Sequence, residues 1–176
     1  MSRLTTVTGL GLLFFILAGS ARADFWTENG CVLAKPEPLL KNGGFRIDDR
    51  TGRAHESLKL GDGIVVRLEQ SHCEYVSRTY TFILKPPPED TDIIGWQYRK
   101  ALELLALLEK RSSQKLKLGD ERKALKAYAD LVVDPKTDVE INIRPPHDQF
   151  YELISLDAQV RQQETQLVVT SKSGPY

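Results

Sequence analysis

The stretch RTYTFILKPPP, residues 78–88, marks the point at which the chain changes from strands to helices. Tyr80, Phe82 and Leu84 share one face of an extended segment, because successive side chains of a strand alternate between its two sides. The three prolines that follow end the strand, since proline has no N–H group to donate to a ladder. We therefore expect a sheet before this stretch and helices after it.

Upstream of this stretch, short alternating segments separated by glycine-containing turns predict a β-meander. The sharpest turn is expected at Gly61-Asp62-Gly63. A first short strand is expected at the apolar run that begins with Cys31. The expected strands are residues 31–34, 45–48, 53–60, 64–69 and 78–85.

Downstream, apolar residues recur at helical spacing from Ile94 to about Arg111, which predicts a helix that buries one face against the sheet. Gly119 is expected to end the preceding segment and Asp120 to cap a second, shorter helix. This second helix should end at Asp134-Pro135. The apolar stripe of the first helix comprises Tyr98, Ala101, Leu105 and Leu108, widened by Trp96, Leu102 and Leu104.

The last third of the chain returns to strands, expected at residues 139–143, 150–156 and 166–171, with a polar connector over 157–165. Strands, then helices, then strands indicate an α+β fold with a mainly antiparallel sheet. In this fold a helical hairpin is inserted between an N-terminal β-meander and the C-terminal strands. We expect residues 24–176 to form one α+β domain.

Residues 1–23 have the three parts of a signal peptide: a basic start at Arg3, an apolar run over 10–18, and small residues at Ala21 and Ala23. The apolar run is about half the ~20 residues that span a bilayer, so no transmembrane anchor is expected after cleavage. The mature chain should begin near Asp24 and be periplasmic or secreted.

Cys31 and Cys73 are the only cysteines. In an oxidising compartment such a pair predicts one disulfide, which would contribute roughly 4 kcal/mol on the chain-entropy estimate. The alternative is a reactive or metal-binding thiol, with His72 beside Cys73.

The chain has 24 basic and 24 acidic residues, and the predicted leader contains two of the basic ones, so the remainder has a net charge of about −2. Such a balance gives no bulk attraction to nucleic acid, and no nucleic-acid partner is expected. One segment is locally basic and is either a docking surface for an acidic partner or lipopolysaccharide phosphates, or a solvated helix surface. Its basic residues are Lys110, Arg111, Lys115, Lys117, Arg122, Lys123 and Lys126.

The sequence contains no motif of an activated nucleophile, a phosphate-binding loop or a close pair of metal-binding histidines, so we expect no cofactor and no metal. The one local group suited to acid–base chemistry is His147, Asp148 and Glu152, with Tyr151 beside them.

The leader, the size and the cysteine pair lead us to expect a non-enzymatic module that binds another protein of the cell envelope. An inhibitor or immunity protein acting on an envelope-targeted hydrolase is one example, by analogy of size and location. The alternatives are a small secreted hydrolase or lyase that uses the His147, Asp148 and Glu152 cluster, and an accessory subunit of an envelope complex.

Overall fold

The computed structural model describes residues 24–87, 94–132, 135–145 and 150–175, and it confirms the predicted α+β fold with a helical insert. The predicted leader lies outside the described residues. The helices are α1 (Phe25–Glu28), α2 (Ile94–Arg111) and α3 (Gly119–Leu131). The strands are β1 (Arg46–Asp48), β2 (Arg53–Gly61), β3 (Ile64–His72), β4 (Val76–Leu84), β5 (Ile141–Asn142), β6 (Phe150–Val160) and β7 (Thr165–Pro175).

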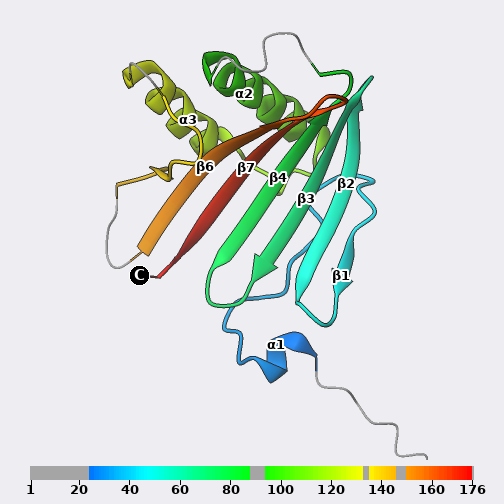
Figure 1. Ribbon diagram of the computed structural model, residues 1–176. Coiled ribbons are helices and arrows are strands. Elements are labelled where there is room, and N and C mark those ends of the chain that lie inside the picture. The colour runs from blue at the N-terminus through cyan, green and yellow to red at the C-terminus, as the bar shows by residue number, and fades with distance from the viewer. Residues whose placement is uncertain (1–23, 88–93, 133–134, 146–149, 176) are drawn as a thin grey trace, which may run out of the picture.

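All seven strands form one antiparallel sheet in the order β1-β2-β3-β4-β7-β6-β5 (Figure 1). The meander β1–β4 therefore continues into the last strand of the chain, because β4 pairs with β7 along its whole length. Tyr80 of β4, for example, lies opposite Val169 of β7.

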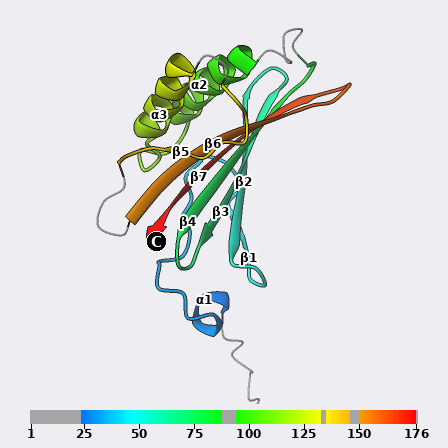
Figure 2. The same ribbon diagram turned by 60° about the vertical axis from the view of Figure 1, so that its left-hand side comes forward.

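The helices α2 and α3 pack on one face of the sheet, and the other face carries no helix among the described residues (Figures 1 and 2). The core lies between the sheet and these helices. It includes Tyr80 and Phe82 from β4, Leu105 and Leu108 from α2 and Leu125 from α3, all fully buried. The apolar face predicted for the first helix is thus the face that packs on the sheet.

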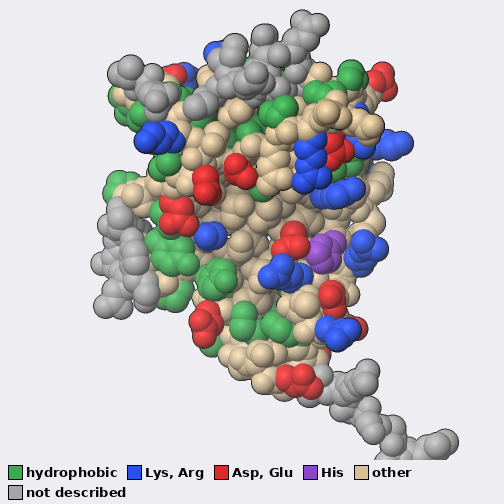
Figure 3. Space-filling view, viewed as in Figure 1, with side chains coloured by type: hydrophobic (Ala, Val, Ile, Leu, Met, Phe, Trp, Pro, Cys, Tyr) green, Lys and Arg blue, Asp and Glu red, His purple; other side chains and the backbone are tan. Residues whose placement is uncertain are grey.

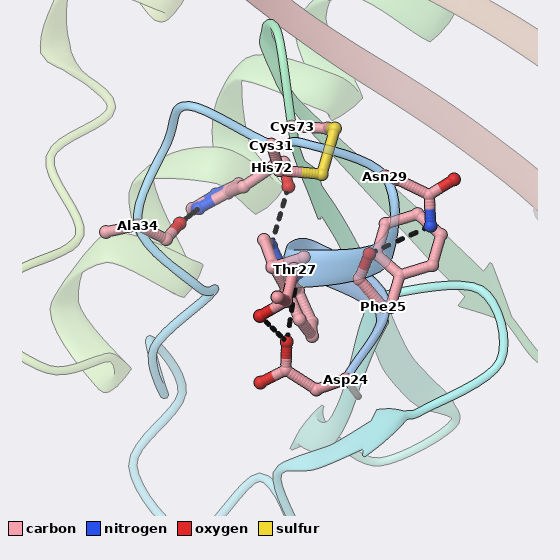
Figure 4. The surroundings of a disulfide bond; sticks show 9 residues. Asp24, Phe25, Thr27, Asn29, Cys31, Ala34, His72 and Cys73 are labelled. Atoms are coloured by element: carbon pink, nitrogen blue, oxygen red, sulfur yellow. Dashed lines mark hydrogen bonds between the residues drawn. A yellow bond between two sulfur atoms is a disulfide. The ribbon is translucent and has the colours of Figure 1, made fainter. Parts of the chain in front are cut away.

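The N-terminal segment is fastened to the end of β3 by the predicted disulfide between Cys31 and Cys73, whose Cα atoms lie 4.4 Å apart (Figure 4). Trp26 is buried beside it and donates its indole N–H to the carbonyl oxygen of His72 at 2.9 Å. Neither cysteine is free, so the alternative of a reactive or metal-binding thiol does not hold.

The structure differs from the predicted strands in three places. The strand expected at 139–143 is reduced to the two residues of β5. Residues 31–34 do not form a strand, because the segment crosses the end of β3 and only Leu33 N–H bonds there, to the oxygen of Cys73 at 3.2 Å. The expected polar connector over 157–165 is mostly strand: β6 runs to Val160, and β7 begins at Thr165 after a tight turn. The polar residues Asp157 and Gln159 misled the prediction because they alternate with residues of the buried face, as strand residues do.

The start of α3 also differs from its prediction in detail. The N-cap is Leu118, not Asp120, and its side chain makes no capping bond. Instead, Glu109 of α2 accepts the backbone N–H of Leu118 at 3.1 Å. The helix ends at Leu131, while the predicted stop at Asp134 lies outside the described residues.

No helix among the residues that the structure describes is long and apolar enough to cross a membrane.

Candidate functional site

The basic segment predicted as a docking surface extends over two helices and their connection. Its residues lie at the end of α2, on the connection and on α3, and three of them form ion pairs. Lys115 pairs with Glu37, Arg122 with Glu109 and Lys126 with Asp130. The other four border three hollows. Lys117 and Lys123 line two different hollows beside α3, and Lys110 and Arg111 line a third at the end of α2. Three of the seven cations are thus paired, and the other four border three different hollows.

Of the cluster predicted for acid–base chemistry, His147 and Asp148 lie outside the described residues. Glu152 is on β6, half-buried, with its Oε1 atom 3.5 Å from Nη1 of Arg144. Arg144 also donates to Asp120 at 2.6 Å, so that these ion pairs hold the segment after β5 against the start of α3.

Glu121 lies in the same charged region, in the first turn of α3. Burial raises the pKa of its carboxyl group, and the neighbouring carboxylates of Asp120 and Glu152 act in the same direction, while Arg78 opposes them. The group borders a hollow of about 360 Å³ that also contains Lys117 and Arg144. No three His, Cys, Asp or Glu side chains among the described residues are placed to hold a metal ion.

The uncovered face of the sheet carries a larger hollow, of about 510 Å³, over β1–β4. In Figure 3, a histidine lies among basic and acidic side chains over β2 and β3. The hollow is lined by Gly43, Gly44, Arg46, His55, Glu56, Ser57, Arg67, Leu68, Glu69, Thr79 and Thr81.

The sheet register brings these polar side chains together. Residues directly opposite one another in antiparallel strands point to the same face. One row across the strands consists of Arg46, His55, Glu69 and Thr79, and the next consists of Ser57, Arg67 and Thr81. We call these two rows the polar face.

Glu69 is the acceptor at the centre of the polar face. Its Oε1 atom accepts a hydrogen bond from Nη1 of Arg53 at 2.9 Å, and its Oε2 atom lies 3.7 Å from Nδ1 of His55. Arg67, two residues before Glu69 on β3, and Arg46, beyond His55 on β1, are both exposed, and neither forms an ion pair with another described residue. The polar face therefore has an excess of positive charge.

This arrangement suits binding more than catalysis. Guanidinium groups donate two parallel hydrogen bonds to a carboxylate or phosphate, and Ser57 and Thr81 add neutral donors. Thr79 is engaged with Thr170, their hydroxyl oxygens 3.4 Å apart. Within the part of the chain that the structure describes, no hydroxyl or thiol hydrogen-bonds to His55, so no nucleophile with its base is assembled here.

The sequence analysis did not single out the residues of the polar face, because they come from separate strands. One signal was present: in β3, Arg67 and Glu69 alternate with Val66 and Leu68, which marks a strand with one charged face. Which residues lie beside them depends on the register with β2 and β4, which is fixed by the hairpin turns together with the burial of the opposite face of the sheet.

Comparisons with protein-family models, with curated proteins and with solved structures give no significant match, so the residues of the site carry the functional argument alone.

Proposed function

We propose that the protein is a non-enzymatic module that works outside the cytoplasm and binds an acidic surface of another protein through the polar face. The single observation that carries this proposal is the position of Arg46 and Arg67. Both are exposed in a hollow that contains hydroxyl donors, and neither is neutralised by a described carboxylate.

Exposure of a polar sheet face is not by itself evidence of binding, because antiparallel sheets often have one solvated face. The kind of residue on this face favours binding. Arginine is enriched at protein interfaces and among the residues that dominate their affinity. A carboxylate of the partner placed between Arg46 and Arg67 would have two guanidinium groups within reach, while Glu69 already has Arg53.

The location outside the cytoplasm is supported by the predicted leader over residues 1–23 and by the Cys31–Cys73 disulfide. Mass spectrometry of protein made in a secreting host should find Asp24, or a neighbouring residue, at the N-terminus. A full-length chain with reduced cysteines in the cytosol would contradict this part of the proposal.

The partner is expected to be another protein of the cell envelope, and an envelope-targeted hydrolase that this chain inhibits is the narrower form of the proposal. The support for that form is analogy of size and location. Its test is inhibition of the captured enzyme by the purified chain.

The polar face is tested by charge reversal. The double variant Arg46→Glu/Arg67→Glu should lose the partner that the wild-type chain captures from envelope extract. The matched control is Arg99→Glu/Arg161→Glu, which reverses two exposed arginines on α2 and in the β6–β7 turn. The control should capture the partner as the wild type does. Equal capture by all three proteins would show that the polar face is not the interface.

A further inference from the structure

A second basic site, separate from the polar face, lies at the end of α2 beside the edge of β2. It is a hollow of about 440 Å³, which we call the basic notch. Its charged residues come from three segments that are far apart in the sequence: Lys41 from the N-terminal segment, Lys59 from β2, and Lys110 and Arg111 from α2. No carboxylate is among its described lining residues.

The four cations of the basic notch have no carboxylate partner among the described residues. Each is exposed, and none forms an ion pair with another described residue. By contrast, Lys115, which lies just beyond α2, is paired with Glu37. The basic notch thus contains two unpaired cations of the basic segment, Lys110 and Arg111, joined by two lysines from elsewhere in the chain.

The end of a helix accounts for only half of this cluster. Basic residues in the last turn interact favourably with the negative end of the helix dipole, which explains Lys110 and Arg111. It does not explain Lys41 and Lys59, which are outside any helix. Four like charges around one hollow repel each other and exceed the roughly half charge of the helix end, so the notch remains strongly positive.

The backbone holds Lys41 in this position. The two residues before it, Leu39 and Leu40, are buried, and the carbonyl oxygen of Leu39 accepts the backbone N–H of Ser113, which follows α2, at 2.9 Å. The carbonyl oxygen of Gly43, two residues after Lys41, accepts the backbone N–H of Ser57 from β2 at 2.7 Å. The segment that carries Lys41 is therefore tied to both elements that supply the other cations, which prepares the site before any ligand arrives.

We propose that the basic notch binds a phosphoryl group, either of a soluble phosphorylated molecule or of a lipid headgroup. A phosphoryl group presents several negatively charged oxygens at one point. Ammonium groups from Lys41, Lys59 and Lys110 and the guanidinium fork of Arg111 match that charge. The side-chain amide of Asn42, which also lines the notch, adds a neutral donor.

The test is titration of the purified protein with inorganic pyrophosphate at constant ionic strength, followed by isothermal calorimetry. The double variant Lys41→Gln/Lys110→Gln should bind about tenfold more weakly or worse, because hydrogen bonds to charged groups are among the stronger ones. The matched control is Lys117→Gln/Lys123→Gln, which removes two exposed lysines of the same basic segment from outside the notch. The control should bind as the wild type does.

A second arm distinguishes the two sources of the phosphoryl group. Binding to vesicles of phosphatidylglycerol mixed with phosphatidylcholine, compared with phosphatidylcholine alone, reports on a lipid headgroup. Pyrophosphate binding that is weakened in the notch variant supports a soluble phosphorylated ligand. Vesicle binding that is weakened in the notch variant, without any pyrophosphate binding, supports a lipid headgroup. Absence of both, or an equal loss in the control variant, would overturn the proposal. The polar-face variant Arg46→Glu/Arg67→Glu should leave either result unchanged, because its arginines lie outside the notch.

Discussion

The carboxylate of Glu56 accepts the backbone N–H of Leu40 at 2.7 Å, inside the protein, with the Glu56 residue only 3% exposed. The same carboxylate accepts the N–H of Leu39 and the side-chain amide of Gln70. A single acidic side chain of β2 thus supplies the acceptor for a segment that has no strand partner at this point. The hydrogen bonds to this buried carboxylate hold residues 39 and 40, and with them Lys41, against the sheet.

The first prediction is that Glu56→Leu destabilises the protein by about 3 kcal/mol, because it leaves buried N–H donors without an acceptor. Glu56→Gln keeps one acceptor oxygen and should lose less. Urea unfolding followed by circular dichroism measures the free energy of unfolding. Glu103→Gln, at an exposed site on α2, is the control and should change little. Wild-type stability in Glu56→Leu would show that the buried carboxylate does not hold the segment.

The disulfide gives the second prediction. Replacing both cysteines, in Cys31→Ser/Cys73→Ser, should lower the free energy of unfolding by roughly 2–5 kcal/mol, since the link between the N-terminal segment and β3 is lost. Urea unfolding with and without a reducing agent measures the effect. Reductant should bring the wild type close to the double variant and leave the double variant unchanged. Identical midpoints for all four samples would count against a stabilising role.

The third prediction concerns Glu121, whose pKa is raised by burial. The carboxyl group of Glu121 keeps its proton to a higher pH in the folded protein than in the unfolded chain. Above the ordinary pKa of 4.5, the folded state therefore binds more protons than the unfolded state does. Stability from this group is present at low pH and is lost as the pH rises through the folded pKa. Glu121→Gln should therefore raise the melting temperature relative to wild type at pH 7, with a smaller difference at pH 4.

Thermal unfolding of both proteins across this range measures the difference, and Glu103→Gln again serves as the exposed control. A Glu121→Gln protein that is less stable than wild type at neutral pH would show that the ionised carboxylate has a favourable partner.

The fourth prediction concerns His72, where the sign is opposite. Burial lowers the pKa of this imidazole, with a smaller contribution from Arg78, although the hydrogen bond of Nδ1 with the Ala34 oxygen at 3.2 Å acts against it. The unfolded state binds more protons below the ordinary pKa of 6.5, so stability falls as the pH drops through that value.

His72→Gln should flatten this loss between pH 7 and pH 5 in urea unfolding. The comparison is made against His55→Gln, which removes a histidine from the polar face and leaves His72 in place. If the two variants have the same pH dependence, His72 is not the group responsible.

The sequence by itself determined the class of each major element, because that information is local. Alternation of Tyr80, Phe82 and Leu84 identified a strand with one buried face. The recurrence of apolar residues identified the helix from Ile94 to Arg111, with the bounds that α2 has. The number of cysteines and the predicted leader were sufficient to predict the Cys31–Cys73 bond. In each case the side-chain period or the residue type decides the structure without reference to a distant partner.

The tertiary structure alone decided which distant residues meet. The pairing of β4 with β7 and the convergence of Lys41 with Arg111 depend on contacts between residues far apart in the sequence. The rows of the polar face, which extend from β1 to β4, depend on the combined register of three hairpins. Register is set by burial of one whole face of the sheet against α2 and α3, which is a property of all the strands together. For this reason the sequence identified a basic segment as one unit, whereas the fold places only Lys110 and Arg111 of that segment beside Lys41 and Lys59.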